Sequence, residues 1–414
     1  MKTMVTPDEA REIIFSYIVP LETEECEIEA LFGRTLAREI VSEFQLPPFD
    51  NSAMDGFALR CEDAQNASVE NPVVLKVREI IGAGSVGQKK VTTGNCAQIM
   101  TGAPIPDGAD AVVMREETRR VGETQVAIEA GVRQGQNIRR AGSDVQIGET
   151  VLCGGDVVGA AQWGMLASLN QNRAQVFRRP RVAIITTGDE IAPVGDELQP
   201  GHIRDSNSWT LRGLLQNCGV DVQHFKIGDD AEILRETLLS CAQTCDAIVT
   251  SGGVSMGDFD AVRDVLPQIA DVRFWKIAMK PGKPLMFGTI GKVPVWGLPG
   301  NPVSVMVGFE QFARPALLKM QGRRAWNRNE IPVEVQAAFR SPAGKVEYVR
   351  AKVRRNSGVL CGWVAETTGD QGSGRLSTMT AANALLIVPA DVTEVAAGQT
   401  LTAQMLDWGE ELCP

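Results

Sequence analysis

The sequence is poor in histidine and has no paired cysteine motif, and these absences exclude several classes of metalloenzyme. Only two histidines, His202 and His224, occur among 414 residues. That number excludes His-rich zinc sites and HExxH peptidases, and it disfavours a histidine-centred catalytic triad. The nine cysteines are scattered without a CxxC motif, and the closest pair, Cys241 and Cys245, has the spacing of one helix face. Dispersed cysteines in odd number predict free thiols in a reducing cytoplasm.

Long apolar runs and an excess of positive charge are missing as well. No window reaches about 18 uninterrupted apolar residues, and residues 1–15 lack the apolar core of a signal peptide. We therefore expect a cytoplasmic protein that is neither exported nor membrane-spanning. The chain has 41 Lys and Arg against 51 Asp and Glu, a net charge of −10. This balance disfavours nonspecific binding to nucleic acid or anionic membranes, although a local cationic cluster can still bind a small anion.

Length and composition predict a globular protein of several domains. At about 150 residues per domain the chain holds about three, and 44% hydrophobic with 22% charged residues is ordinary for folded domains. A helix begins at Pro7, since Thr6 and Glu9 form a capping box, and it ends at Pro20. A second short helix is expected over 28–32.

The pattern of apolar and turn residues then changes twice along the chain. Between Pro47 and about Asp144, short alternating runs separated by turn residues predict a β-rich module, such as a small barrel. A helical stretch near 158–169 and a basic linker at 178–181 follow. From Arg181 to Gly322 strands and helices alternate, which predicts a largely parallel three-layer α/β domain. After Trp326 the alternation predicts a small C-terminal β domain, so the fold class is multidomain α/β plus β.

Within the α/β domain, the run 182–186 is β-branched except at Ala183 and suits a strand buried on both faces. A long helix is expected to begin at Asn301 and Pro302 and to kink at Pro315. The predicted strands are 182–186, 220–226, 247–250, 274–279, 285–289 and 293–297, and the other predicted helices are 208–218, 231–241 and 261–266. In the C-terminal domain the predicted strands are 346–353, 359–364, 384–388 and 400–405.

Polar and glycine-rich segments follow the strands of the α/β domain, so most of them should converge on one rim of the sheet. These segments are 187–190, 229–230, 251–260, 280–284 and 297–302, with the turn 205–207 at the start of a helix. Glycines and helix N-termini let backbone N–H groups approach an anion. Lysines add positive charge, and carboxylates are hard ligands suited to Mg²⁺. The combination is typical of a metal-assisted nucleotide or phosphoanhydride site.

Each part also has a purely structural interpretation. Asp229 and Asp205 could equally be helix caps, and Gly252-Gly253 alone is more often a tight turn than a phosphate cradle. Lys280 and Lys283 could be exposed lysines of a surface turn with no role in binding. In the β-rich module, residues 50–52 suit an Asx-type turn, and residues 137–144 suit either a solvated basic turn or an anion clamp built on arginine.

Together these segments resemble the molybdopterin molybdenumtransferase family, which includes the E domain of gephyrin. Eight segments carry the resemblance in family order over essentially the whole chain: FDNSAMDGFA (49–58), MTGAPIPDGADAVV (100–113), GQNIRRAGSD (135–144), TTGDEI (186–191), IRDSN (203–207), SGGVSMGDFD (251–260), KPGKP (280–284) and GLPGNPVS (297–304).

The resemblance implies an elongated four-domain subunit that forms a homodimer. The implied domains are I (1–48 and 145–178), II (49–144, β-rich), III (179–325, α/β, molybdopterin-binding) and IV (326–414, β). The implied activity converts adenylated molybdopterin and molybdate to molybdenum cofactor and AMP, with Mg²⁺. The adenylyltransferase of the preceding step and molybdoenzyme chaperones are the implied protein partners, and neither nucleic acid nor membrane is among the partners.

The resemblance also assigns roles to individual positions. Glu190 and Asp260 are implied as metal or nucleotide-phosphate residues, and Asp229 as a nearby catalytic carboxylate. Two lysines, Lys276 and Lys280, would stabilise phosphate charge. Domain II would present Asp55, Thr101, Arg139 and Asp144 to the α/β site of the other subunit. Molybdate would be held by Ser255, Lys283, Arg350 and Ser373, and the binding loops would include Gly252, Gly253, Pro299 and Pro302.

Two other functions remain open. Adenylyl transfer to molybdopterin uses the same kind of α/β domain, but the β-rich module and the C-terminal domain favour the insertion step. A scaffold of the kind seen in gephyrin's receptor clustering would need a groove for a helical target and usually further domains on a long linker. The sequence has no such linker.

Overall fold

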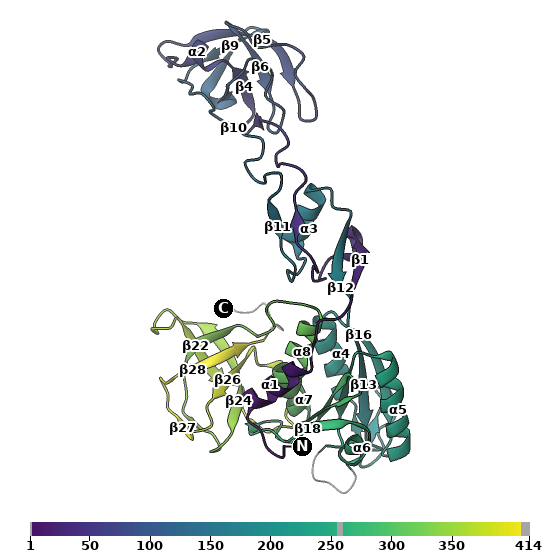
Figure 1. Ribbon diagram of the computed structural model, residues 1–414. Coiled ribbons are helices and arrows are strands. Elements are labelled where there is room, and N and C mark those ends of the chain that lie inside the picture. Colours follow the sequence, from purple (N-terminus) through teal and green to yellow (C-terminus); the bar gives the residue numbers. More distant parts are fainter. Residues whose placement is uncertain (1, 255–259, 407–414) are drawn as a thin grey trace. The chain divides into compact units, whose positions relative to one another are not determined.

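The computed structural model describes residues 2–254 and 260–406, which fall into two compact units (Figure 1). The first unit comprises Met1–Ala37, Gly155–Trp163 and Asn172–Pro414, and the second comprises Arg38–Gly154 and Gly164–Gln171. Across the described ranges, no helix combines the length and apolar character needed to cross a bilayer.

The second unit is built on a six-stranded sheet with the order β7-β4-β6-β5-β9-β8. Strand β4 is buried on both faces, because Phe57 and Leu59 pack into one apolar cluster while Ala58 packs into another. A β-rich module is thus confirmed; instead of a barrel, the pairings among its described residues give an open strand order. Its elements are β2 (Ile40–Val41), β3 (Asn51–Ser52), β4 (Gly56–Leu59), α2 (Cys61–Ala64), β5 (Val73–Ile81), β6 (Asn95–Ile99), β7 (Ala111–Met114), η2 (Arg115–Glu117), β8 (Thr118–Val121), β9 (Gln125–Ile128), β10 (Ile138–Arg139) and β11 (Thr150–Leu152).

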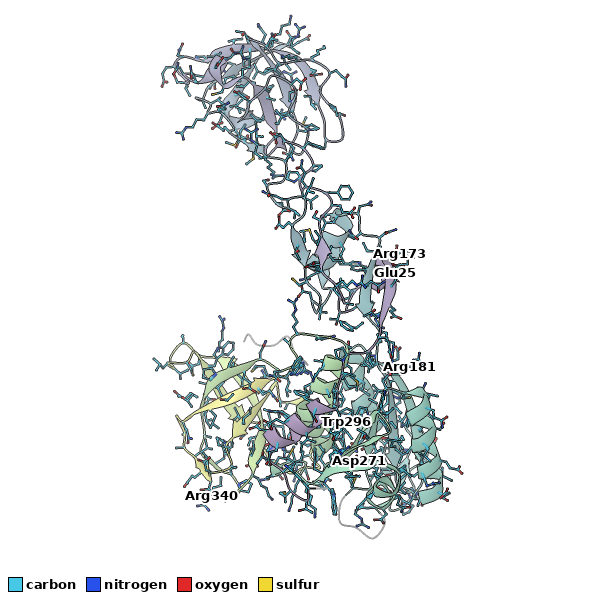
Figure 2. The ribbon with its side chains drawn as sticks, in the orientation of Figure 1. Glu25, Arg173, Arg181, Asp271, Trp296 and Arg340 are labelled. Carbon is cyan, nitrogen blue, oxygen red and sulfur yellow. The ribbon has the colours of Figure 1, made fainter. Side chains whose placement is uncertain are left out.

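The first unit begins with the predicted helix α1 (Pro7–Ser16). Its capping box is present, since Glu9 N–H donates to Thr6 Oγ1 (3.2 Å) and Thr6 N–H donates to Glu9 Oε2 (2.8 Å). Residues 28–32 form only a 3₁₀ turn, η1 (Ile28–Ala30). The predicted helix near 158–169 is α3 (Ala160–Ser168). Strands β1 (Thr23–Glu27) and β12 (Arg173–Phe177) pair antiparallel, and Figure 2 labels one ion pair between them, Glu25 with Arg173 (3.5 Å).

The α/β domain is a three-layer sandwich, as predicted. Its sheet has the order β16-β13-β17-β21-β20-β18. The first four strands are parallel, β20 pairs antiparallel with β21, and β18 pairs antiparallel with β20. Helices α5 and α6 cover one face, and α1, α4, α7 and α8 cover the other (Figure 1). Its elements are β13 (Arg181–Thr187), β14 (Ile191–Ala192), β15 (Ile203–Arg204), α4 (Asn207–Asn217), β16 (Asp221–Ile227), α5 (Ala231–Thr244), β17 (Ala247–Ser251), α6 (Ala261–Ile269), β18 (Asp271–Trp275), β20 (Met286–Ile290), β21 (Val293–Leu298), α7 (Pro302–Gly308) and α8 (Arg314–Met320).

The predicted strand 274–279 is wrong in one respect, because two strands replace it. Strand β18 ends at Trp275, and Lys276 has φ +88°, a left-handed conformation that interrupts extended backbone. The chain resumes as β19 (Met279–Lys280), which pairs with the sheet of the C-terminal domain. The segment that precedes Lys283 is therefore shared between two domains.

The long last helix is irregular, but the irregularity precedes the proline rather than starting at it. A π-helical turn, η3 (Phe309–Ala313), separates α7 from α8, and Pro315 lies in the first turn of α8. Proline has no N–H to donate to the carbonyl four residues earlier, which is that of Gln311. Arg11 Nε donates to this carbonyl instead (3.4 Å).

The C-terminal domain closes into a ring of five strands, because β24 pairs with both β25 and β26. The remaining pairs are β25–β22, β22–β28 and β28–β26. The predicted strand 359–364 is displaced to β25 because the chain turns between Asn356 and Gly362, where Asn356 N–H donates to Gly362 O (3.0 Å). Its elements are β22 (Glu330–Val335), β23 (Phe339–Arg340), β24 (Val346–Arg355), β25 (Trp363–Thr367), α9 (Leu376–Thr380), β26 (Ala384–Val388), β27 (Glu394–Val395) and β28 (Thr400–Met405).

Candidate active site

The polar segments that follow the parallel strands converge on one cleft, as the sequence predicts. This rim cleft, of about 430 Å³, lies at the carboxyl ends of β13, β16, β17 and β21. Its lining residues are Thr186, Thr187, Gly188, Glu190, Ile191, Ile203, Asp205, Asn207, Asp229, Ser251, Gly252, Gly253, Val254, Asp260, Gly300 and Asn301. The position matches the rule that ligands of open α/β sheets bind at the carboxyl ends of the strands.

Some acidic residues near the rim cleft cap helices, and others do not. Asp230, and not Asp229, caps α5, since its Oδ1 accepts from the N–H groups of residues 232 and 233 (2.9 and 3.0 Å). Asp205 caps α4 by accepting from Ser208 N–H (3.0 Å). Asp205 therefore caps α4 and also lines the cleft, whereas Asp229 lines the cleft without capping α5. A role as ligand stays a prediction for both residues.

Asp229 forms a reciprocal pair with Asp189. Each carboxylate accepts a long hydrogen bond from the other residue's N–H, at 3.4 and 3.3 Å. Next to this pair, Gly188 has φ +130°, and an added Cβ would lie 2.4 Å from a carboxylate oxygen of Glu190. Only glycine permits both this backbone conformation and the approach of the Glu190 side chain. The end of β13 thus places the Glu190 carboxylate against the backbone at Gly188, while Asp189 pairs with Asp229.

The glycine-rich turn after β17 is tight for structural reasons. Gly252 and Gly253 have φ +99° and +66°, and a Cβ on Gly253 would lie 3.0 Å from Val262 Cγ2. Gly252 N–H donates to Leu298 O (3.1 Å), so this N–H is occupied by the sheet. The tight-turn interpretation is supported, and a role in anion binding stays a prediction. Ser255 lies outside the described residues.

Asn207 links the loops around the rim cleft, although the sequence analysis did not single it out. Its Nδ2 donates to Ser251 Oγ (2.9 Å) and to Gly300 O (2.7 Å). The side chain of Asn207 therefore connects the turn 205–207 to the end of β17 and to the loop before α7. Sequence spacing gives no signal for these two contacts, because the partners are 44 and 93 residues away from Asn207.

His224 contacts Thr186, one of the residues that line the rim cleft. His224 Nε2 lies 3.1 Å from Thr186 Oγ1, and His224 Nδ1 lies 3.2 Å from an Arg212 nitrogen. Burial lowers the pKa of His224, and the charge of Arg212 lowers it further. Because Arg212 can only donate, Nδ1 accepts, so the neutral ring carries its proton on Nε2 and donates to Thr186.

A second cleft of about 460 Å³, the lysine cleft, adjoins the first, since Asn301 lines both. It gathers four predicted residues: Lys280, Lys283, Pro299 and Ser373. Its lining residues are Met279, Lys280, Pro281, Gly282, Lys283, Pro284, Pro299, Asn301, Ser304, Lys345, Asp370, Gln371, Gly372 and Ser373. Lys345, which the sequence did not single out, adds a third ammonium group.

Three other predicted residues lie beside these clefts without lining them. Lys276 Nζ lies 4.1 Å from the centroid of the Trp275 ring, and Trp275 Nε1 donates to Val254 O (3.1 Å) in the wall of the rim cleft. Pro302 occupies the first position of α7, directly after Asn301. Arg350 is only 1% exposed.

Arg350 is held by the loop that carries Ser373. Its guanidinium donates to the carbonyls of residues 370, 371 and 372 (3.2, 3.2 and 3.0 Å) and to Thr378 Oγ1 (3.1 Å). Ser373 O in turn accepts from Val303 N–H (3.1 Å) at the start of α7. Arg350 therefore positions this loop, and its direct contact with molybdate stays a prediction.

In the second unit, the three motifs of the β-rich module meet one another. Asp55 Oδ1 accepts from both the N–H and the Oγ1 of Thr101 (2.7 Å each), and these bonds hold the pKa of Asp55 below its usual value. Asp50 accepts from Ala141 N–H (2.8 Å) and from Arg140 (2.5 Å), which lowers its pKa likewise. The side chains of Arg139 and Asp144 are exposed.

The donors of the rim cleft suit magnesium but do not form a complete metal centre. Within 2–254 and 260–406, no three His, Cys, Asp or Glu residues are grouped so that they could hold an ion. Glu190 and Asp260 both line the cleft. Mg²⁺ commonly takes one or two carboxylates and completes its octahedron with phosphate oxygens and water. The residues present fit that pattern.

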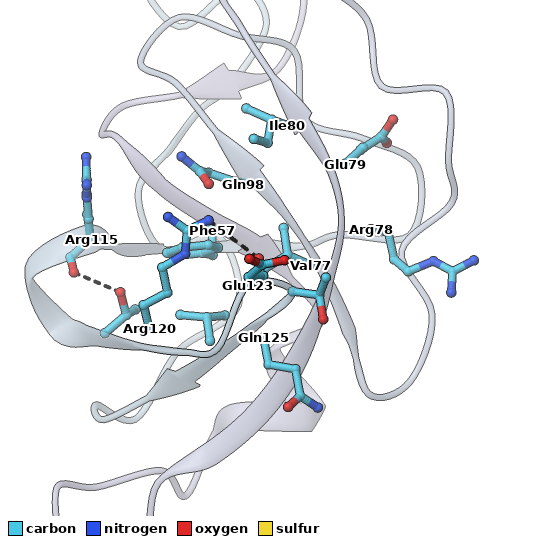
Figure 3. A pocket seen from close by; sticks show the side chains of 13 residues that line it. Phe57, Val77, Arg78, Glu79, Ile80, Gln98, Arg115, Arg120, Glu123 and Gln125 are labelled. Atoms are coloured by element: carbon cyan, nitrogen blue, oxygen red, sulfur yellow. Dashed lines mark hydrogen bonds between the residues drawn. The ribbon is translucent and has the colours of Figure 1, made fainter.

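A further pocket, of about 300 Å³, lies in the β-rich module and holds none of the predicted site residues (Figure 3). Its arginines serve the local turns: Arg120 donates to Glu123 O (3.5 Å), and the Arg115 carbonyl accepts from Thr118 Oγ1 (2.8 Å). Because these hydrogen bonds stabilise local turns and the predicted site residues lie elsewhere, we do not treat this pocket as the active site.

Three family models match the chain in succession. They are the "MoeA N-terminal region (domain I and II)" over residues 5–170, the "Probable molybdopterin binding domain" over 183–319 and the "MoeA C-terminal region (domain IV)" over 332–406.

Named relatives and a solved structure cover nearly the whole chain. A Mycobacterium tuberculosis protein named molybdopterin molybdenumtransferase 2 is 40% identical over 377 residues, which are 89% of this chain and 91% of the relative. Gephyrin from Dictyostelium discoideum is 36% identical and covers 93% of this chain, which matches 60% of that protein. The crystal structure of the molybdopterin biosynthesis moeA protein from Pyrococcus horikoshii OT3 superposes with a TM-score of 0.83 at 32% identity, and covers 97% of this chain and all of that one. The chain therefore belongs to the molybdopterin molybdenumtransferase family.

Proposed function

We propose that this protein inserts molybdate into adenylated molybdopterin and releases AMP, so that molybdenum cofactor is formed. The observation that carries the proposal is the pair of adjoining clefts. One is lined by carboxylates and glycine-rich turns, and the other by three lysines. A nucleotide-tagged substrate and a second oxyanion need two such neighbouring sites.

The chemistry brings two anions together in a protein of net charge −10. Positive charge must therefore be concentrated locally, and Lys280, Lys283 and Lys345 supply it in the lysine cleft. Fixed charges and oriented groups in a partly enclosed cleft lower a barrier most when they need no rearrangement during the reaction. We infer that molybdate occupies the lysine cleft, held by Lys283, Ser373 and the predicted contribution of Ser255.

The nucleotide part of the substrate would occupy the rim cleft. Glu190 and Asp260 would hold Mg²⁺, which when bound would neutralise phosphate charge and make AMP a better leaving group. Asp229, paired with Asp189, would act as a nearby carboxylate that orients a water or phosphate oxygen. Lys276 and Lys280 would stabilise charge on the phosphate from the side of the lysine cleft.

We further propose that the active assembly is a homodimer. Asp55, Thr101, Arg139 and Asp144 lie on a separate compact unit, and in the proposed dimer they approach the α/β site of the other subunit. Domains I (1–48 and 145–178), II (49–144), III (179–325) and IV (326–414) are the proposed divisions. The proposed setting is the cytoplasm, with the adenylyltransferase of the preceding step and molybdoenzyme chaperones as partners.

The decisive experiment is an incubation of the purified protein with adenylated molybdopterin and Mg²⁺, in which AMP is followed with and without molybdate. We expect AMP release that depends on molybdate and yields active cofactor. A parallel incubation with ATP and molybdopterin tests the alternative of adenylyl transfer. Absence of molybdate-dependent AMP release would refute the proposed function, and adenylation of molybdopterin would favour the alternative.

A further inference from the structure

The lysine cleft is tied to the C-terminal domain through a buried carboxylate that the sequence analysis did not identify. Glu347 lies in β24 and is 3% exposed. Its Oε1 lies 2.7 Å from Lys280 Nζ, and its Oε2 is buried with no hydrogen-bond partner in the part of the chain that the structure describes. Lys280 lines the lysine cleft, whereas Glu347 does not.

Backbone pairing fixes the two residues side by side. Strand β19 runs parallel to β24 with Lys280 opposite Glu347, and Val346 N–H donates to Ala278 O (3.0 Å). The Lys280 side chain is 45% exposed and that of Glu347 is 4% exposed. The pair therefore has one member at the wall of the cleft and the other behind it.

The charge of Glu347 acts on the cleft in two opposing ways. A buried carboxylate is stable only when it is paired, so the ion pair restrains the Lys280 ammonium. The same negative charge offsets part of the positive potential that Lys280, Lys283 and Lys345 create. The carboxylate of Asp370, which also lines the cleft, has an effect of the same sign. Because a partly buried charge is weakly screened, it changes the affinity for an oxyanion in the cleft.

We propose that Glu347 is a positioning residue for the transfer: it fixes the Lys280 ammonium at the edge of the lysine cleft and weakens the resting attraction of that cleft for molybdate. The inference rests on the proposed function. The charge of Glu347 should affect KM for molybdate, because it governs the binding of molybdate. The position of the Lys280 ammonium should affect kcat, because it governs turnover.

Two substitutions separate these effects in the molybdate-dependent AMP assay. Glu347→Gln keeps the size and an acceptor oxygen but removes the charge, so KM for molybdate should fall on the order of fivefold while kcat falls about tenfold. Glu347→Asp keeps the charge but shortens the side chain, so KM should stay unchanged while kcat falls. General damage to the fold would instead lower the active fraction and leave KM as it was.

A matched control is Glu310→Gln. Glu310 is a buried carboxylate paired with Arg314 and Arg328, and it lines neither cleft. We expect this variant to lose thermal stability without a change in KM for molybdate. An unchanged or raised KM in Glu347→Gln, measured on folded protein, would overturn the inference while the wild-type activity leaves the proposed function intact.

Calorimetric titration with molybdate covers the case in which the wild-type protein releases no AMP. That result would refute the proposed function by itself. The inference would then be decided by the dissociation constants: tighter binding of molybdate by Glu347→Gln than by wild type supports it. Equal or weaker binding, or no binding to either protein, overturns it.

Discussion

Replacement of Arg350 by methionine should destabilise the loop at residues 370–373 and thereby weaken molybdate binding without removal of a direct ligand. Arg350 donates four hydrogen bonds, three to loop carbonyls and one to Thr378 Oγ1. Hydrogen bonds from a charged group contribute about 1.5–3 kcal/mol each. The sum is an upper bound, because the loop is partly exposed and water can replace the arginine, and because burial of the guanidinium itself has a cost.

We therefore expect Arg350→Met to lower the free energy of unfolding by about 3 kcal/mol, measured by urea denaturation. KM for molybdate should rise, since the loop also carries Ser373. Arg350→Lys should recover only part of the loss, because an ammonium cannot reach the four acceptors in the geometry of the planar guanidinium.

The matched control is Arg354→Met on the same strand, where the side chain is exposed and donates one hydrogen bond to Gln336. Its effect on unfolding should stay within about 0.5 kcal/mol. If Arg350→Met unfolds like this control and still raises KM for molybdate, Arg350 contacts the ligand directly and the reasoning from its buried hydrogen bonds is wrong.

Three further predictions concern other parts of the molecule. Asp260→Ala should abolish AMP release while the fold survives in circular dichroism, because Asp260 lines the rim cleft and is one of the two proposed Mg²⁺ ligands; unaltered turnover by the folded variant would contradict the metal assignment. Thr101→Val should slow AMP release on the order of tenfold, because it removes one of two hydrogen bonds that orient Asp55, and an unchanged rate would show that this pair is only structural. Burial alone would raise the pKa of Asp246, but its 2.6 Å bonds from Arg178 outweigh burial and leave that pKa below its usual value. A carboxylate with a depressed pKa stabilises the fold above its unfolded pKa of about 3.9 and loses this contribution as the pH falls through the folded pKa. Asp246→Asn should therefore be less stable than wild type at pH 7, with the two unfolding free energies converging toward pH 3; a difference that does not depend on pH would contradict this.

The sequence was sufficient to predict the strand-helix alternation of the α/β domain and the convergence of its polar segments. Strand β13 could be recognised because β-branched residues fill a run with no polar face, and the capping box at Thr6 and Glu9 is a local signal. Once parallel strands are recognised, topology places their carboxyl ends along one edge, whatever the details of the helices. The rim cleft was predictable for that reason.

Local signals failed where a neighbour distant in sequence decided the outcome. The run 274–279 reads as one strand, yet Lys276 is left-handed and the chain leaves one sheet for another, because β24 offers a second edge to residues 279–280. Asp229 and Asp230 are adjacent acids after a strand, and only the path of α5 selects the second as the cap.

The amino-acid sequence by itself determined the order of the domains, the family, and the set of strand-end motifs, since these depend on periodicity and on residues close together in the chain. Tertiary structure alone decided which charges meet. Arg350 contacts a loop about twenty residues away, and Glu347 pairs with a lysine that belongs to another domain. Neither spacing is a period of a helix or a strand. The pairing of β19 with β24 brings Lys280 to Glu347, and the path of the loop at 370–372 brings its carbonyls to Arg350.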